Sequence, residues 1–265
     1  MFKVGIIGVG NMGEAILNGI IKNSDIKPEE IIVSDINQER IDYIVNKYGV
    51  AGTDNNERLV KLSEIIFLAV KPKDFENTVN PIKDKFEGKI LISVMAGIKI
   101  EKIKSILSKA FIVRIMPNTP ALIGESATGI SFDKSFPANK KEEIINLINT
   151  FGKSFLIDEN LMDAFTGLAG SGPAYIFTII DAFAQAGVKQ GFSYNQALEI
   201  IVQTIKGSSK MVETLKEHPC VLRDKVSSPS GTTIYGLHQL EKGKIRDIII
   251  NTVEESTQRS KELSN

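Results

Sequence analysis

The sequence predicts an α/β protein with a doubly wound, mostly parallel sheet at its N-terminus, followed by an all-helical domain. Over residues 1–155 of the 265-residue chain, short apolar runs alternate with amphipathic segments. From about residue 161 onward this alternation stops, and long helical patterns replace it. Strands that alternate with helices form a parallel sheet with helices on both faces. We therefore expect two domains, residues 1–158 and residues 159–265.

The elements of the first domain follow from these patterns. Apolar runs predict strands at residues 2–7, 31–35, 65–70, 90–94 and 111–115. Amphipathic spacing predicts helices at residues 14–21, 38–48, 75–86 and 100–108. Because parallel strands end at one edge of the sheet, a ligand is expected to bind outside their carboxyl ends.

A glycine turn follows the first predicted strand. In Gly8-Val9-Gly10-Asn11-Met12-Gly13, Gly8 permits the tight turn, Gly10 lets a pyrophosphate approach the backbone, and Gly13 lets helix and strand pack closely. The second strand ends in the acid Asp35. This order of strand, glycine turn, helix and acidic strand end predicts a Rossmann-type dinucleotide site.

Three more loops follow predicted strands at the same edge of the sheet. They are Val70-Lys71-Pro72, Met95-Ala96-Gly97 and the loop from Met116 to Pro120, which contains Asn118. Each is polar or contains glycine, and together with the glycine turn they predict a cleft. Pro72, Gly97 and Asn118 are therefore candidate cofactor contacts.

The second domain is predicted to consist of long helices. Pro173 fits the first turn of a helix that runs to Val188, before Gly191. Ser193 and Gln196 have the spacing of a capping box for a helix that reaches about Leu215, and a last helix is expected at about 244–263. These helices remain rich in apolar residues, so part of their surface is expected to pack on another subunit.

The stretch 224–238, DKVSSPSGTTIYGLH, joins a Pro/Ser/Gly turn to a predicted helix start. Unpaired N–H groups at a helix start carry partial positive charge, so this turn is suited to a small anion such as a carboxylate.

Composition excludes several classes of function. Lysine plus arginine equals aspartate plus glutamate, 32 each, so no basic surface for nucleic acid is expected. The single cysteine, Cys220, excludes an intrachain disulfide, and His218 and His238 lack metal-ligand spacing. The apolar start lacks the layout of a signal peptide, and no apolar run has membrane-spanning length. We expect a cytoplasmic protein without a metal, a membrane partner or a nucleic-acid partner.

Taken together, these motifs resemble those of Δ1-pyrroline-5-carboxylate reductase over essentially the whole chain. The resemblance rests on the glycine turn, Ala69-Val70-Lys71-Pro72, the Met116–Pro120 loop, the stretch GLAGSGPAY at 167–175 and, most specifically, residues 224–238. It implies reduction of the C=N bond of Δ1-pyrroline-5-carboxylate to L-proline by NADPH or NADH, the last step of proline biosynthesis. It also implies that the C-terminal domain is a dimerisation domain, and that dimers assemble into larger rings such as decamers.

The resemblance also implies site residues. The implied nucleotide contacts are Gly8, Gly10, Asn11, Met12, Asn56, Val70, Lys71 and Ala96. The implied substrate loop comprises Val226, Ser228, Gly231, Thr232 and Thr233. One departure is Ser230, where the family usually has glycine, so a positive φ at this position would strain the turn.

The residues present suggest how the reaction proceeds. A protonated imine is already a good hydride acceptor, so no strong protein acid is required, which agrees with the lack of an obvious catalytic histidine or lysine. We expect the Gly231 and Thr232 amides to bind the substrate carboxylate and the Thr233 hydroxyl to contact the ring nitrogen. The alternative for Thr233 is a helix-capping hydroxyl only. His238 is expected to be structural.

Asp35 favours NADH over NADPH, because its carboxylate can accept hydrogen bonds from both ribose hydroxyls and repels a 2′-phosphate. Arg40, about one turn into the next helix, is expected to be too far away to compensate. Ser34 and Asn37 could still accommodate a phosphate if Asp35 points away, so both cofactors stay open.

Two competing functions share parts of this pattern. A β-hydroxyacid dehydrogenase or imine reductase has a lysine a few residues after a glycine-rich helix start, but here the first lysine after Gly170-Ser171-Gly172 is Lys189. A non-catalytic nucleotide-binding paralogue is expected to lose the substrate loop, whereas Thr232 and Thr233 are present.

Overall fold

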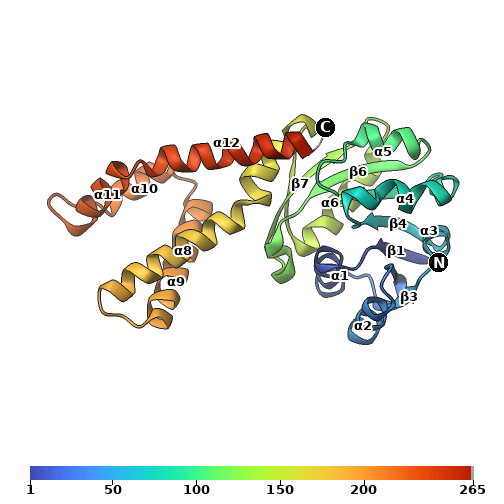
Figure 1. The fold of residues 1–265 in the computed structure, drawn as a ribbon, viewed down its shortest axis with the longest axis horizontal. Coiled ribbons are helices and arrows are strands. Elements are labelled where there is room, and N and C mark those ends of the chain that lie inside the picture. The colour runs from blue at the N-terminus through green and yellow to red at the C-terminus, as the bar shows by residue number, and fades with distance from the viewer. Residues whose placement is uncertain (264–265) are drawn as a thin grey trace. The chain divides into compact units, whose positions relative to one another are not determined.

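A computed structural model describes residues 1–263 of the chain (Figure 1). They form two compact units: Met1–Ser171 together with the residues from Glu255 onward, and Gly172–Glu254. Side chains bind the end of the chain to the first unit: Ser260 Oγ donates to Asp163 at 2.7 Å, and Ser256 Oγ lies 3.1 Å from Ser171 Oγ. The predicted boundary between the two functional domains, at 158/159, lies before Ser171, where the first segment of this unit ends. It stays a prediction.

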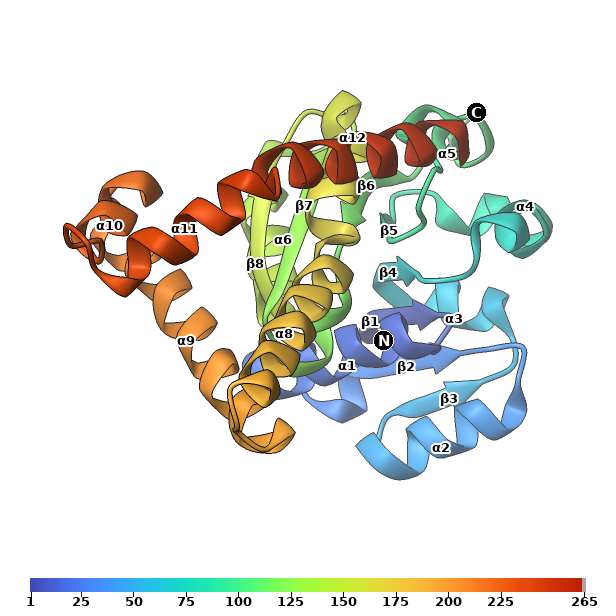
Figure 2. The same cartoon turned by 60° about the vertical axis from the view of Figure 1, so that its left-hand side comes forward.

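The first unit is built on an eight-stranded sheet with the order β3-β2-β1-β4-β5-β6-β7-β8, which can be followed by label in Figure 2. The strands are β1 (Phe2–Ile7), β2 (Ile31–Ser34), β3 (Ala51–Thr53), β4 (Ser63–Leu68), β5 (Ile90–Ser93), β6 (Phe111–Met116), β7 (Ser126–Phe132) and β8 (Gly152–Leu156). Every pairing is parallel except β6 with β7. The predicted fold class is confirmed, and β3, β7 and β8 are additions to the five predicted strands.

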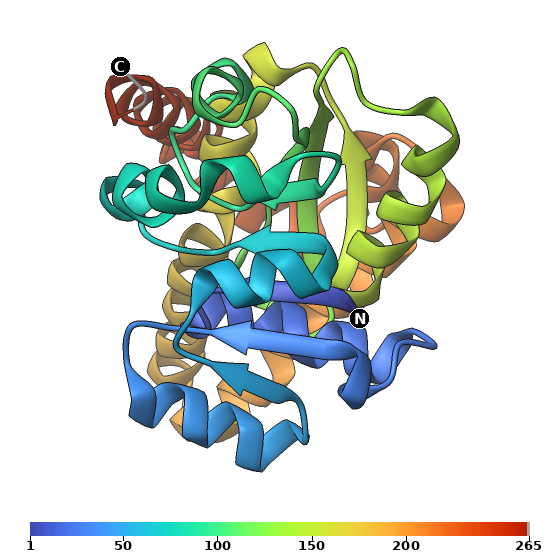
Figure 3. The same cartoon turned by 90° about the vertical axis from the view of Figure 1, so that its right-hand side faces the viewer.

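Alternate residues of the strands fill two cores, one on each face of the sheet. Ile6, Val33 and Phe67 belong to one cluster of buried residues, whereas their neighbours Ile7, Ile32 and Leu68 belong to the other. Helices lie on both sides of the sheet (Figure 3). Strands buried on both faces are apolar at successive positions, which is the pattern that the sequence shows.

The α-helices of the first unit are α1 (Asn11–Asn23), α2 (Gln38–Tyr48), α3 (Asn56–Leu62), α4 (Phe75–Val79), α5 (Ile100–Ile106), α6 (Lys141–Ile148) and α7 (Met162–Phe165). The helix expected at 75–86 is α-helical only to Val79 and continues as a 3₁₀ segment over Asn80–Phe86. Pro81 explains this break, because proline lacks the N–H that an α-helix requires and disfavours helical geometry in the preceding residue.

The second unit is helical, as predicted. It contains α8 (Gly172–Lys189), α9 (Tyr194–Leu215), α10 (Pro219–Lys225), α11 (Thr232–Lys242) and the first part of α12 (Ile245–Leu263). The predicted capping box of α9 is present, with Ser193 accepting from the Gln196 N–H and Gln196 accepting from the Ser193 N–H. In residues 1–263, no helix combines the length and apolarity that crossing a membrane requires.

Candidate functional site

The three glycines of the turn between β1 and α1 differ in what a side chain would meet at each position. Gly8 has φ +90°, and a Cβ there would lie 2.7 Å from the Ala69 carbonyl oxygen. A Cβ on Gly13 would collide with the Gly8 carbonyl, so this glycine lets α1 start close against the turn. A Cβ on Gly10 would meet no protein atom within 4 Å. Gly10 is therefore the glycine that leaves space for something other than protein.

The N-terminus of α1 is suited to an anion. Gly10 is the cap residue, and no side chain caps the helix. Its carbonyl accepts the first helical bond from the Glu14 N–H at 2.9 Å, which leaves the N–H groups of the first turn without an intrahelical acceptor. Such groups bind phosphate, so the turn and helix fit the pyrophosphate of a dinucleotide.

A pocket of about 1090 Å³ lies in the first unit at the carboxyl ends of β1, β2, β3 and β4. Strands β1 and β4 are neighbours, and the chain order of the strands reverses between them. This is the switch point at which open α/β sheets bind their ligands. The pocket is lined by Ile7, Gly8, Gly10, Asp35, Ile36, Asn37, Asp54, Asn55, Asn56, Glu57, Ala69, Val70, Lys71, Lys73, Asp74, Asn77, Thr78, Pro81 and Ile82.

The structure brings six of the predicted cofactor residues together in the lining of this pocket: Gly8, Gly10, Asp35, Asn56, Val70 and Lys71. Buried Ser34 supports the site, since its hydroxyl donates to Asn56 Oδ1 at 2.7 Å. The other predicted residues of the first unit, Asn11, Met12, Gly13, Pro72, Ala96, Gly97 and Asn118, lie outside that lining. Their contact with a cofactor stays a prediction.

Asn118 has a structural role in the described part of the chain. Its Oδ1 accepts from the Ser126 hydroxyl and the Ala127 N–H, both at 3.1 Å, and its Nδ2 donates to the Ala169 carbonyl at 2.9 Å. These bonds hold the loop after β6 to β7 and to the segment before α8.

Of the polar residues that line the pocket after β3, the sequence predictions include Asn56 but not Asp54, Asn55 or Glu57. Asn55 caps α3 by accepting from the Arg58 N–H at 2.9 Å, and it lines the pocket beside Asp54 and Asn56. The run Thr53-Asp54-Asn55-Asn56 is a helix-start pattern that could have revealed α3. The strand before it, Ala51–Thr53, is only three residues long, too short to form the apolar run that marks a strand in the sequence.

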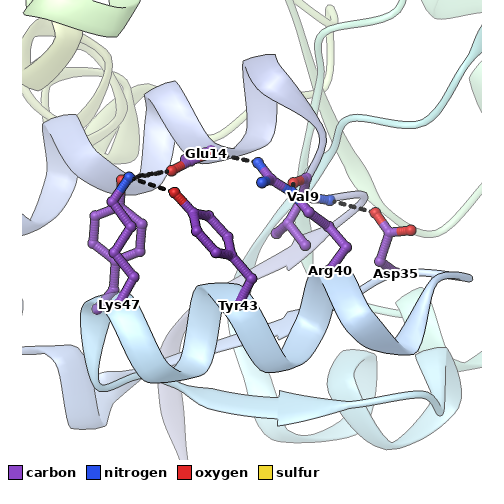
Figure 4. Close-up of polar contacts among 7 residues, drawn as sticks. Val9, Glu14, Asp35, Arg40, Tyr43 and Lys47 are labelled. Carbon is purple, nitrogen blue, oxygen red and sulfur yellow. Dashed lines mark hydrogen bonds and ion pairs between the residues drawn. The ribbon is translucent and has the colours of Figure 1, made fainter.

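A network of polar side chains surrounds the glycine turn (Figure 4). The Val9 N–H donates to Asp35 Oδ2 at 2.9 Å, and the Val9 carbonyl accepts from Arg40 Nε at 2.6 Å. Arg40 also pairs with Glu14 through Nη2 and Oε2. The long Arg40 side chain on the first turn of α2 thus reaches the glycine turn. Whether Arg40 is too far away to compensate for Asp35 at a 2′-phosphate stays a prediction.

Glu14 is a shared acceptor on α1. Its Oε1 accepts from Lys47 Nζ at 2.8 Å and from the Tyr48 hydroxyl at 2.9 Å. Burial by itself raises the pKa of Glu14, but the hydrogen bonds from Lys47, Arg40 and Tyr48 outweigh it and lower the pKa below its usual value. The hydrogen bond to Glu14 also raises the pKa of Lys47. Glu14 is thus an anion near neutral pH.

The predicted substrate loop lies in the second unit, between α10 and α11. Val226 and Ser228 are exposed, and Thr232 begins α11 without a side-chain cap. The Gly231 N–H, expected to bind the substrate, instead donates to the Ser228 carbonyl at 3.1 Å. Ser230 has φ +58°, so the strain foreseen for serine at this position is present.

Thr233 lies in the first turn of α11 and is partly buried. Among residues 1–263, its hydroxyl makes no hydrogen bond, and the cap position is held by Gly231. The alternative of a capping hydroxyl therefore finds no support in this geometry.

Comparison with known proteins shows the family to which the chain belongs. The pyrroline-5-carboxylate reductase of Arabidopsis thaliana is 40% identical to this chain over 99% of its residues and 96% of the plant protein. The chain belongs to the pyrroline-5-carboxylate reductase family. Residues 159–263 match the family model described as pyrroline-5-carboxylate reductase dimerisation, which supports a homo-oligomer, and residues 3–97 match one described as NADP oxidoreductase coenzyme F420-dependent.

Solved structures of this family share the fold. The Plasmodium falciparum pyrroline carboxylate reductase with NADP bound superimposes with a TM-score of 0.90 at 33% identity, covering 100% of this chain and 98% of that one. The Coxiella burnetii pyrroline-5-carboxylate reductase gives a TM-score of 0.93 at 30% identity, covering 100% and 99%. The predicted family and enzyme class are confirmed, and both competing functions are set aside.

Proposed function

We propose that this chain reduces the C=N bond of Δ1-pyrroline-5-carboxylate to L-proline with NADH or NADPH, as the last step of proline biosynthesis. The observation that carries the proposal is a pocket at the switch point of the sheet, bordered by an uncapped helix start and by Gly10, in a chain of this family. When bound there, the reduced nicotinamide supplies the hydride. Gly8, Gly10 and the first turn of α1 hold its pyrophosphate.

The substrate binds at the start of α11. We assign its carboxylate to the N–H groups of Thr232 and Thr233, because the Gly231 N–H already has an acceptor in Ser228. The Thr233 hydroxyl, which has no protein acceptor in residues 1–263, contacts the ring nitrogen and relays a proton to it from the surrounding water. Most of the rate then comes from positioning, because a protonated imine needs no strong acid.

The geometry of Asp35 supports NADH as a cofactor at least as good as NADPH. The Val9 and Asn37 N–H groups each donate to one of its oxygens, at 2.9 and 3.0 Å. A carboxylate has about four lone-pair positions, so acceptor capacity remains for ribose hydroxyls. Asp35→Ser is expected to shift the ratio of kcat/KM values toward NADPH, and a strong wild-type preference for NADPH that this change leaves intact would contradict the assignment.

The oligomer is proposed to form through the helices of the second unit. Several large apolar side chains on these helices are exposed, including Phe177 at 62% and Ile250 at 57%. Surfaces of this kind mark interfaces. Light scattering at micromolar concentration should give a dimer or a ring of dimers such as a decamer, and a stable, active monomer would contradict the proposal. The cytoplasmic location stays a prediction.

A direct assay tests the activity. Oxidation of NADH and NADPH is followed after addition of Δ1-pyrroline-5-carboxylate, with a 2-hydroxyacid and a mixture without substrate as controls. The proposal requires oxidation with the imine alone. Oxidation only with the hydroxyacid series, or nucleotide binding without any turnover, would reject it.

A further inference from the structure

Arg40 lies beside the residue that Asp35 contacts. The Val9 N–H donates to Asp35 and the Val9 carbonyl accepts from Arg40, so the carboxylate and the guanidinium flank one residue of the glycine turn (Figure 4). Asp35 lines the pocket and is the proposed partner of the ribose hydroxyls. The Arg40 guanidinium therefore places a positive charge next to the proposed ribose position.

Arginine suits a phosphate well, because its planar fork of N–H groups matches the phosphate oxygens. Here the fork is already engaged. Nε binds the Val9 carbonyl and Nη2 pairs with Glu14, with Arg40 25% exposed and Glu14 15% exposed. This partial burial limits screening by water and salt, so the pair persists in solution.

Two further side chains hold the Glu14 carboxylate in place beside Arg40. Tyr48 and Lys47 hold its other oxygen, and the same contacts keep its pKa below the usual value, so the carboxylate stays charged. Glu14 also keeps a negative charge beside Arg40, which offsets the positive charge that a 2′-phosphate would need there. Both effects act against a 2′-phosphate more than against a ribose hydroxyl.

We propose that Glu14 is a specificity-determining residue that withholds Arg40 from a nucleotide 2′-phosphate. This inference rests on the proposed function, since it assumes that a nucleotide binds in the pocket with its ribose at Asp35. It separates two tasks of Arg40. Its bond to Val9 positions the turn for every nucleotide, whereas its remaining N–H groups would recognise NADPH only after release from Glu14.

The test compares AMP with adenosine 2′,5′-bisphosphate, two probes that differ only in the 2′-phosphate. Their dissociation constants are measured by calorimetry on the full-length chain in its own oligomeric state. Glu14→Gln keeps the size of the side chain but removes its charge, so Arg40 is released. A new charge-assisted bond to phosphate should then tighten the bisphosphate relative to AMP by about tenfold.

Three variants control for indirect effects. Arg40→Met should weaken both probes by the same factor and leave their ratio at the wild-type value. Glu14→Gln combined with Arg40→Met should lose the gain of the single change. Lys47→Met removes a cation from Glu14 without touching Arg40, and its probe ratio should equal that of the wild type.

Two results would overturn the proposal. One is an unchanged probe ratio in Glu14→Gln with an unchanged melting temperature. The other is an Arg40→Met variant whose preference for the bisphosphate over AMP is lower than that of the wild type, which would show that Arg40 already binds the phosphate in the wild type. This second measurement tests the proposal even if Glu14→Gln fails to fold. If wild-type protein binds neither probe, the proposed nucleotide site itself fails, which is a separate outcome.

Discussion

Replacing Gly10 by alanine should weaken nucleotide binding without lowering the stability of the fold. Gly10 has φ −64° and ψ −163°, a conformation open to any L-residue, and the added methyl group meets no protein atom within 4 Å. Folding should therefore tolerate the change. A Gly→Ala substitution at a compatible position raises the free energy of unfolding by about 0.4–1 kcal/mol, because it restricts the unfolded chain.

The same methyl group should obstruct the nucleotide. It occupies the space beside the N-terminus of α1 where we place the pyrophosphate, so at least one backbone hydrogen bond to phosphate is lost. A hydrogen bond to a charged group contributes about 1.5–3 kcal/mol, which corresponds to a rise in Kd of roughly tenfold to a hundredfold.

Gly13→Ala is the matched control. Its methyl group would collide with the Gly8 carbonyl, and overpacking of this kind lowers the free energy of unfolding by about 1–3 kcal/mol. The assay pairs thermal unfolding with titration of NADH by its fluorescence. Gly10→Ala should melt at or above the wild-type temperature and bind weakly, whereas Gly13→Ala should melt lower. Wild-type affinity in Gly10→Ala would refute the placement of the pyrophosphate at this residue.

Three further predictions concern other parts of the chain. Thr233→Ala should lower kcat by about two orders of magnitude and leave nucleotide affinity unchanged. This is the effect expected from losing one hydrogen bond of about 2–3 kcal/mol to the substrate in the transition state. Steady-state kinetics and NADH titrations measure both quantities, and near wild-type turnover would remove the hydroxyl from the mechanism. Ser230→Gly should raise the free energy of unfolding by roughly 1 kcal/mol, because glycine adopts φ +58° without strain, and chemical denaturation measures this. Asp133→Asn should lower the free energy of unfolding at pH 7 by about 1–3 kcal/mol. Burial raises the pKa of the Asp133 carboxyl, but hydrogen bonds from Ser135, Ile112 and Lys104 outweigh this effect and lower the pKa below its usual value. A depressed pKa stabilises the fold above the unfolded-state pKa, so the difference between variant and wild type should shrink as the pH falls below about 4. A difference independent of pH would contradict the role of the charge.

The first half of the nucleotide site could be predicted because its signals are local. Three glycines at fixed spacing after an apolar strand define the turn. The structure gives Gly8 and Gly13 a steric reason and leaves open space at Gly10. The capping box at Ser193 is equally local and was predicted to the residue. Signals of this kind depend on a few neighbouring residues and do not need the tertiary fold.

The missed parts depend on tertiary contacts. Strand β7 contains Gly129 and three hydroxyl residues, and β8 is an edge strand with Phe155 and Leu156 exposed, so neither has the apolar run of a buried strand. The partner of the Gly231 N–H is set by the shape of a turn that no pattern specifies. The reach of Arg40 depends on where α2 packs, which the sequence alone does not fix.

The two hydrogen bonds that hold Val9 matter for any attempt to change the cofactor preference of this enzyme. Its N–H is held from the end of β2 and its carbonyl from α2, so the residues usually exchanged to alter nucleotide preference also shape the phosphate-binding loop. Replacing Asp35 alone removes the proposed ribose partner and, at the same time, one of the two hydrogen bonds that hold Val9. A change of cofactor preference should therefore replace residues 35–40 together with position 14, so that the new residues also supply the hydrogen bonds that hold the loop.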